Sequence, residues 1–418
     1  MKQIRQILWP LYLKLFLLKK TDNCHKRLLS GIRERGYARV VFFASNLSMW
    51  RYQGIYDLMR QDPRFKTLIL LVPFNNYSDS QKTENINALR DFFNSKNIPF
   101  EDTTDWPKEK FALKEWFNPD ILFYPQPYER YYGNLLDSVY YRDRLLCFAP
   151  YGVGTVATVW SVNTPFQNLA WRLFYETDIY REVAQKITYN KGRNVVVVGN
   201  TNADIFLESN HSNPWKEQSG LKKRIIWAPH FSIKSDMKLH RSSFLWLHDM
   251  MVNIAQQYSD TLQFAFKPHP KLKTELYKMD DWGKERTDEY YRTWATMPNT
   301  QLEESSFIDL FMTSDAMIHD CASFTVEYHY SKKPCLFTTN DIQETREPLN
   351  ELGRAALDAH YFGKDAQDIC RFLDEVVLKG ADPKKDEREA FFRKYLLPPN
   401  GKTAAGNILD NIVESIWG

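Results

Sequence analysis

The chain has 418 residues, of which 43% are hydrophobic and 26% charged, so it can form two hydrophobic cores and is too apolar to be disordered. Its 55 Lys and Arg against 52 Asp and Glu give a net charge of +3, which excludes the strong basic excess of a nucleic-acid-binding surface. Five scattered cysteines without C-x-x-C spacing indicate neither a disulfide framework nor a thiolate zinc site, and they favour a reducing compartment.

Residues 4–18 are strongly apolar and aromatic, but this stretch is shorter than the roughly 20 residues needed to cross a bilayer. Trp9, Tyr12 and Phe16 beside Lys and Arg suit a segment that lies in the headgroup layer. Basic residues follow this stretch, at the place where a secretory signal would have its cleavage site. We therefore predict that residues 1–30 are an amphipathic membrane-associating segment. The alternative is a helix docked on the protein itself or on a second copy.

The next part of the chain, residues 31–208, alternates short apolar runs with amphipathic stretches, as expected of β-α units. Strands are predicted over residues 37–44, 67–72, 120–124, 145–149 and 195–198, and helices over 50–60, 81–94 and 166–189.

A polar, turn-rich stretch over residues 209–222 predicts a linker, followed by a second domain over 223–418. Strands are predicted there over residues 224–227, 262–266, 316–318 and 335–337, and helices over 244–258, 306–312 and 324–330. The alternation predicts an α/β protein with two doubly wound, Rossmann-like domains facing a central cleft. The last helix is expected to pack back on the first domain.

Lys267-Pro-His269-Pro ends an apolar strand abruptly. The prolines stop the strand and keep the backbone extended, so Lys267 and His269 project to the same side. A cation beside an imidazole suits phosphate oxygens. The alternative is a rigid surface turn.

The segment from Ser314 to Tyr328 predicts a strand, a tight turn and a helix that begins near Ser323. Free N–H groups at a helix start favour an anion, and Glu327 is on the same helical face as Ser323, within reach of ribose hydroxyls. Asp320 is either a ligand contact or a satisfied turn residue. An alternative of equal weight is that Ser323 is only a helix cap and Glu327 only a solvated side chain.

Two weaker signals lie elsewhere. His230 follows the predicted strand at 224–227 and faces the same side as His269, although a lone histidine is more often structural. Residues 149–157 match G-x-G-x-x-A, but the match is too deep in the domain for a dinucleotide fingerprint and indicates a glycine turn. P-loop, H-E-x-x-H, G-x-S-x-G and D-x-D motifs are missing, so no metal or cofactor is expected.

These motifs, in this order, resemble the CDP-glycerol glycerophosphotransferase family of teichoic acid polymerases and primases. The resemblance covers residues 145–337. It rests on five sequence elements: Lys267-Pro-His269-Pro, Ser314-Asp through Asp320-Cys-Ala322-Ser323 to Glu327, Lys333-Pro, Gly199-Asn-Thr-Asn-Ala-Asp204 and Ala228-Pro-His230.

The resemblance implies a GT-B fold with the nucleotide held by the C-terminal domain. It implies donor contacts from Lys267, His269, Asp320, Ala322, Ser323 and Glu327, and an acceptor side at Tyr151 and Gly152. The implied reaction moves a polyol phosphate, most readily glycerol phosphate, from a CDP donor to a lipid-linked glycan at the cytoplasmic face of a bacterial membrane. No nucleic acid takes part.

The chain departs from the family pattern at Tyr151, where the family has the histidine proposed as catalytic base. Tyrosine has an ordinary pKa near 10 and is a poor base at neutral pH. We therefore place His230 beside His269 and Lys267 among the catalytic candidates. Two other functions fit the same fold: a glycosyltransferase using a nucleotide sugar, and a nucleotide-binding scaffold of a capsule assembly complex that has lost catalysis.

Overall fold

The computed structural model describes residues 11–104, 106, 113–128, 131–132, 136–156, 162–233, 242–304 and 307–418. The predicted positions Trp9, Ala157 and Ser306 lie outside these ranges. The chain forms two compact units. Unit 1 comprises Met1–Gly152, Thr158–Asp204 and Leu397–Gly418, and unit 2 comprises Val153–Ala157 and Ile205–Leu396. Each unit is built on one parallel sheet, so the predicted α/β class with two doubly wound sheets is confirmed.

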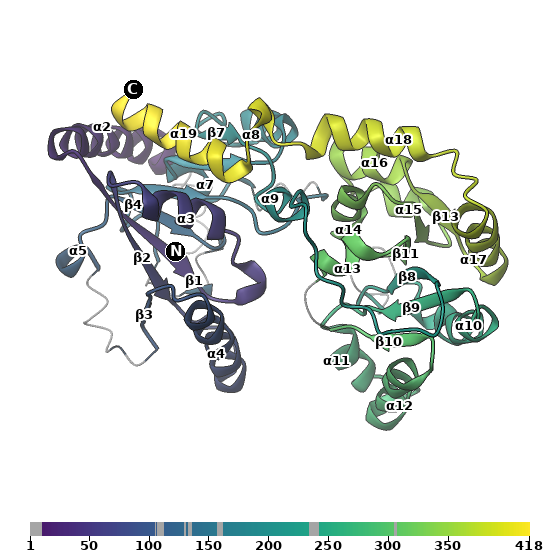
Figure 1. Cartoon of the computed structure of the whole chain (residues 1–418). Coiled ribbons are helices and arrows are strands. Elements are labelled where there is room, and N and C mark those ends of the chain that lie inside the picture. Colours follow the sequence, from purple (N-terminus) through teal and green to yellow (C-terminus); the bar gives the residue numbers. More distant parts are fainter. Residues whose placement is uncertain are drawn as a thin grey trace. The chain divides into compact units, whose positions relative to one another are not determined.

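Unit 1 contains a seven-stranded sheet in the order β3-β2-β1-β4-β5-β6-β7 (Figure 1). Its strands are β1 (Ala38–Ala44), β2 (Phe65–Leu71), β3 (Glu101–Asp102), β4 (Ile121–Tyr124), β5 (Leu145–Phe148), β6 (Arg172–Tyr175) and β7 (Val195–Val197). Its helices of four or more residues are η1 (Leu13–Leu17), α2 (Leu18–Arg35), α3 (Gln53–Gln61), α4 (Asp79–Ser95), α5 (Leu113–Trp116), α7 (Pro165–Leu169), α8 (Asp178–Ile187), α9 (Ala203–Phe206), which runs across the boundary of the units, and α19 (Ala404–Trp417).

The central strand β1 explains why both faces of this sheet are covered. Val40 and Phe42 belong to one buried cluster, whereas Val41 and Phe43 belong to the cluster on the opposite face. Successive side chains of a strand point to opposite faces, so a continuous apolar run requires helices on both sides. The last helix, α19, lies along α2 and α3 and adds Ile408 and further residues to the first cluster (Figure 1).

The prediction of one helical stretch over residues 166–189 was wrong. The structure divides it into α7, β6 and α8. Strand β6 pairs with β5 and β7, and three of its four residues are buried. The apolar and aromatic run Leu173-Phe-Tyr175 is favourable in a strand, and pairing on both sides outweighs its helical periodicity.

Unit 2 contains a six-stranded sheet in the order β10-β9-β8-β11-β12-β13. Its strands are β8 (Lys223–Ala228), β9 (Leu262–Phe266), β10 (Thr300–Leu302), β11 (Ala316–His319), β12 (Cys335–Thr338) and β13 (Tyr361–Gly363). Its helices are α10 (Phe244–Gln257), α11 (Leu272–Tyr277), α12 (Gly283–Thr296), α13 (Ile308–Thr313), α14 (Phe324–Glu327), η5 (Tyr328–Ser331), α15 (Ile342–Arg346), α16 (Glu351–Asp358), α17 (Ala366–Arg371), η6 (Phe372–Leu378), α18 (Lys385–Phe391) and η7 (Phe392–Leu396).

The beginning of the described chain is helical, with one buried and one exposed apolar face. Leu13, Leu17 and Leu18 pack against Leu169 of α7. The exposed apolar side chains on the other face are Leu11, Tyr12, Leu15 and Phe16, each about half exposed or more. Among the described residues, no helix combines the length and the apolar character needed to cross a bilayer.

Candidate active site at the carboxyl edge of the second sheet

The candidate site lies where three neighbouring parallel strands of unit 2 end. Strands β9, β8 and β11 lie side by side, and their carboxyl ends meet at one edge of the sheet. His269 follows β9 and its backbone N–H donates to the carbonyl of Pro229, 3.0 Å away. The backbone N–H of His230, which follows β8, donates to Oδ1 of Asp320 at 2.5 Å. The residues singled out on three separate strands therefore share one edge.

The imidazoles of His230 and His269 are neighbours, with ring centroids 5.0 Å apart. Nδ1 of His269 accepts the backbone N–H of Lys271 at 3.1 Å. Nδ1 of His230 accepts the backbone N–H of Ser232 at 3.3 Å and lies 2.8 Å from the Ser232 hydroxyl. Because a backbone N–H can only donate, the proton of each neutral ring is on Nε2. Both rings thus offer an N–H donor rather than a basic nitrogen at Nε2.

Burial and nearby positive charge control the protonation of His269. Burial, and then His230, Lys271 and Lys267, lower the pKa of His269 to about 3. The imidazole is therefore neutral at neutral pH. Burial also lowers the pKa of Lys267, whereas Glu303 and Glu304 favour its charged form. A lysine that is only 6% exposed and a neutral N–H donor together favour a ligand with negatively charged oxygens.

Asp320 was a candidate for contact with the donor, but it does not lie on the surface of the site. It is fully buried. Besides the His230 N–H on Oδ1, its Oδ2 accepts bonds from the backbone N–H of Ser243 at 2.5 Å and from the hydroxyls of Ser242 and Ser243 at 2.8 and 2.7 Å. These bonds hold the loop after β8 and the start of α10 together. Asp320 is accordingly a positioning residue for His230.

The turn after β11 contains the other predicted donor residues. Ser323 is exposed directly before α14, and its hydroxyl lies 3.2 Å from Sγ of Cys321. Glu327 is only 3% exposed at the end of this helix. The helix has four residues instead of the predicted seven and continues as a 3-10 turn. Its dipole is correspondingly small, so an anion beside Ser323 would be bound mainly by the hydroxyl and the backbone of that residue.

Ala322 and the glycine-rich segment are joined by a contact that the sequence did not reveal. The carbonyl of Ala322 accepts a bond from the hydroxyl of Thr155 at 3.4 Å. The backbone carbonyl of Thr155 in turn accepts a bond from the backbone N–H of Asn350 at 2.8 Å. Tyr151 and Gly152, the predicted acceptor-side residues, belong to unit 1. The side chain of Tyr151 is 42% exposed, and its carbonyl accepts a bond from Asn202 at 3.2 Å.

Sequence reasoning missed several residues that shape this edge. Glu303 directly follows β10, and its backbone N–H donates to Phe266 at the end of β9. The strand before Glu303 is Thr300-Gln-Leu302, which is short and largely polar, so no local pattern marked this carboxylate. Ser242, Ser243 and Ser232 carried no signal either, because isolated serines are common in loops and their partner Asp320 is distant in sequence.

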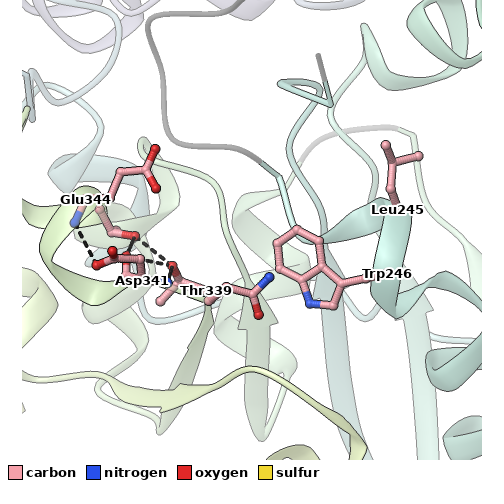
Figure 2. Close-up of a pocket in the computed structure, with 7 residues that line it drawn as sticks. Leu245, Trp246, Thr339, Asp341 and Glu344 are labelled. Carbon is pink, nitrogen blue, oxygen red and sulfur yellow. Dashed lines mark hydrogen bonds between the residues drawn. The ribbon is translucent and has the colours of Figure 1, made fainter. Parts of the chain in front are cut away.

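A pocket of about 490 Å³ lies at the end of β12 in the same unit (Figure 2). It is lined by Leu245, Trp246, Thr339, Asn340, Asp341, Glu344 and Thr345. The carboxylate of Asp341 accepts the backbone N–H groups that begin α15. Two of the lining residues are acidic and none is basic, so this pocket does not suit a diphosphate, in contrast to the part of the same edge at the end of β9 that carries Lys267.

The segment that carries this site also matches a protein family. Residues 172–414 match the model of CDP-Glycerol:Poly(glycerophosphate) glycerophosphotransferase. The chain belongs to this family. It is therefore a CDP-glycerol glycerophosphotransferase-like enzyme, and the resemblance inferred from the sequence motifs is confirmed. A comparison with curated protein sequences gave no significant match.

Solved structures share the GT-B-like fold. The wall teichoic acid polymerase TagF superposes with a TM-score of 0.58 at 13% identity, over 99% of this chain and 98% of that chain. A putative UDP-N-acetylglucosamine 2-epimerase from Listeria monocytogenes gives 0.59 at 12% identity, over 91% and 97%. MnaA from S. aureus, solved with UDP, gives 0.58 at 13% identity, over 90% and 96%. At these identities the likeness establishes only the fold of this glycerophosphotransferase family member. Its substrates must be inferred from the residues of the site.

Proposed function

We propose that this enzyme transfers glycerol phosphate from CDP-glycerol to a hydroxyl of a lipid-linked glycan or polymer in the synthesis of a bacterial cell-surface polymer. The proposal rests on one observation: Lys267, His269 and His230 converge at one edge of the sheet, within the segment that matches the family. The donor diphosphate would lie against the Lys267 cation and the Nε2–H group of His269. Glu327 would accept the ribose hydroxyls, and Ser323 would contact a phosphate.

The proposed reaction is a phosphoryl transfer. The acceptor oxygen forms a bond to the phosphorus of the glycerol phosphate, and the bond from that phosphorus to the bridging oxygen breaks. CMP leaves with the bonding electron pair, and the proton of the acceptor hydroxyl passes to water. Lys267 and His269 stabilise the negative charge that spreads over the phosphate oxygens. His230, with its proton on Nε2, fits the same stabilising role better than that of a base.

The first test measures the thermal stability of the full chain with CMP, CDP-glycerol, CDP-ribitol, UMP, UDP-sugars and ADP. A ligand at 100 times its Kd adds about 2.7 kcal/mol to the free energy of unfolding. We expect a clear rise in Tm with cytidine ligands alone. We expect that rise to disappear in the double variant Lys267→Ala/His269→Ala.

The other outcomes of this panel separate the competing functions. A preference for UDP-sugars would replace the proposed donor by a nucleotide sugar. Binding of CDP-glycerol without turnover, in the presence of a competent acceptor, would favour a non-catalytic scaffold. No shift with any nucleotide would contradict the assignment of the site.

We further propose that the N-terminal segment holds the enzyme on the cytoplasmic face of the membrane, beside its lipid-linked acceptor. The exposed side chains of Leu11, Tyr12, Leu15 and Phe16 share one face, and Lys14, Lys19 and Lys20 are exposed nearby. Apolar side chains that enter the headgroup layer gain hydrophobic energy, and the lysines are attracted to anionic lipid.

Co-sedimentation with phosphatidylglycerol vesicles tests this placement. We expect the double substitution Leu15→Asp/Phe16→Asp to abolish most vesicle binding, because it places two carboxylates on the lipid-facing surface. Leu221→Asp is the matched control, since Leu221 is fully exposed in unit 2 and outside the segment. Unchanged vesicle binding in the double variant, or a loss of self-association instead, would contradict the membrane assignment.

A further inference from the structure

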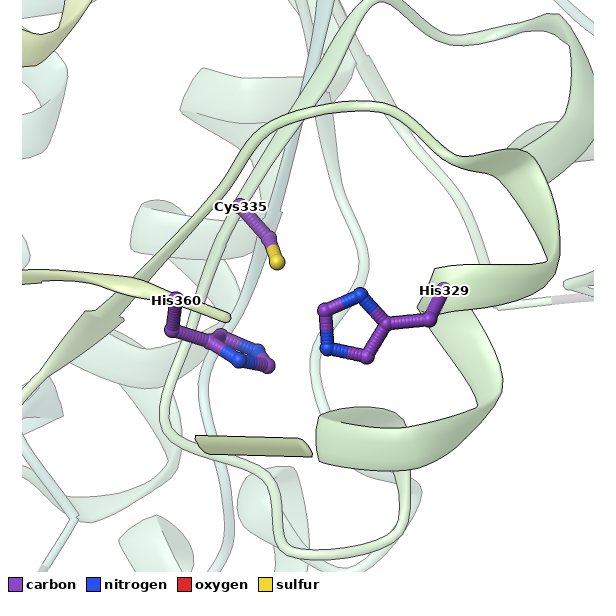
Figure 3. A group of neighbouring side chains, drawn as sticks. All are labelled: His329, Cys335 and His360. Atoms are coloured by element: carbon purple, nitrogen blue, oxygen red, sulfur yellow. The ribbon is translucent and has the colours of Figure 1, made fainter. Parts of the chain in front are cut away.

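Three side chains with metal-binding atoms converge inside unit 2, apart from the donor residues (Figure 3). His329 comes from η5, Cys335 begins β12, and His360 directly precedes β13. All three are fully buried. One nitrogen from each imidazole and Sγ of the cysteine lie within 4.8 Å of one another. Ligand atoms around a tetrahedral zinc ion are about 3.5 Å apart, so modest side-chain movements would close this group around an ion.

The hydrogen bonds of the two histidines leave a lone pair on each ring. The carbonyl of Ala356 is 3.1 Å from Nε2 of His329 and 2.9 Å from Nδ1 of His360. A carbonyl only accepts, so these two nitrogens carry the protons. A backbone carbonyl that holds the second N–H is the usual way to orient a metal-binding histidine. Nδ1 of His329 is buried and has no hydrogen-bond partner among the described residues, a costly state unless something binds it.

The surrounding charges are compatible with a cation and one thiolate. Two basic groups act on Cys335 and His360. The fully buried Arg388 forms an ion pair with Asp382, and Lys384 forms one with Glu387, so neither pair has a net charge. Burial raises the pKa of the Cys335 thiol to about 12, and the thiol keeps its proton when no ion is bound. A bound ion would replace that proton, as in other thiolate sites.

We propose that His329, Cys335 and His360 bind one Zn²⁺ ion that links η5, the start of β12 and the turn before β13. His319 is the nearest further donor, with its Nε2 at 3.0 Å from Nε2 of His360. In the absence of an ion, this Nε2–H donates to His360, because Nδ1 of His319 accepts the N–H of Cys321 at 3.2 Å. Zinc replaces this hydrogen bond. The role of the ion is structural, since it joins η5 to the starts of two neighbouring strands, β12 and β13, and contributes its binding energy to folding.

The sequence contains no signal for this site. The three residues do not follow any common zinc-ligand spacing, and the cysteine pattern pointed away from a thiolate zinc site. Only the fold brings them together. This inference does not depend on the proposed reaction, because none of the three residues is assigned to the donor.

The test uses the full-length protein without a histidine tag, purified from cells grown with added zinc. We expect about one zinc ion per chain by elemental analysis, and less than about 0.1 in Cys335→Ser. Cys147→Ser is the matched control, because Cys147 is an equally buried cysteine of unit 1, and its zinc content should equal that of the wild type. With Co²⁺ in place of zinc, the wild type should show a thiolate-to-cobalt absorption band that Cys335→Ser lacks.

A zinc content near zero in the folded wild type would overturn the proposal. So would zinc or cobalt binding that is unchanged in Cys335→Ser. If Cys335→Ser fails to fold, His329→Gln provides the second variant, and circular dichroism confirms that the comparison is made on folded protein. Removal of the ion by a chelator should lower Tm by several degrees in the wild type and in Cys147→Ser.

Discussion

Replacement of His269 or Lys267 by alanine is expected to lower kcat for glycerol phosphate transfer by about 10²–10³ without unfolding the protein. In the proposed reaction, each variant removes one group that faces the charge developing on the transferred phosphate. His269 is neutral at neutral pH and donates through Nε2–H, so its loss removes a hydrogen bond rather than a base. Release of CMP from CDP-glycerol, measured with saturating acceptor, gives the rate.

Two control variants separate loss of chemistry from loss of structure. Lys223 is at the amino end of β8, the opposite edge of the same sheet, and is paired with Asp315. His211 is a half-buried histidine of unit 2 that is paired with Asp309. Lys223→Ala and His211→Ala should retain near wild-type kcat. Full activity of both Lys267→Ala and His269→Ala would show that the chemistry takes place elsewhere.

The location of the site was predictable from the sequence because proline marks the ends of two strands. Predicted strand 262–266 agrees with β9 at both ends, and predicted strand 224–227 differs from β8 by one residue at each end. Pro229 directly follows β8 and Pro268 lies two residues after β9, and neither proline can donate a backbone N–H to a neighbouring strand. These prolines located His230 and His269 just beyond the strand ends. Parallel pairing then placed both residues at one edge.

The functions of buried polar side chains were not predictable in the same way. Asp320 was a candidate for ligand contact, and only the fold reveals that Ser242 and Ser243 occupy its carboxylate. Strands β3, β10 and β13 were also missed. They have two or three residues each, so their stability comes from a neighbouring strand rather than from a local hydrophobic pattern.

Acidification below about pH 6.5 is expected to destabilise both units, because each contains a histidine that is at least partly buried and resists protonation. These histidines are His25 in unit 1 and His269 in unit 2. Burial lowers the pKa of His25 to about 4 and that of His269 to about 3. In the unfolded chain both return to about 6.5, so the unfolded state binds more protons between pH 6.5 and about 4. The free energy of unfolding therefore has its full value above pH 6.5 and decreases as the pH is lowered towards 4. Each histidine is expected to lower the free energy of unfolding by roughly 3 kcal/mol as the pH falls from above 6.5 to about 4.

The pH dependence of urea unfolding measures this effect, and His25→Gln assigns part of it. His25 lies in unit 1, where its Nε2–H donates to the carbonyl of Arg144 at 3.0 Å. Glutamine keeps a donor but does not titrate. The variant should lose stability at pH 7.5 and show a shallower decline between pH 6.5 and 4, by about one proton released per folding event. An identical slope in the wild type and the variant would mean that His25 is protonated equally in the folded and unfolded states, contrary to its burial against Arg144.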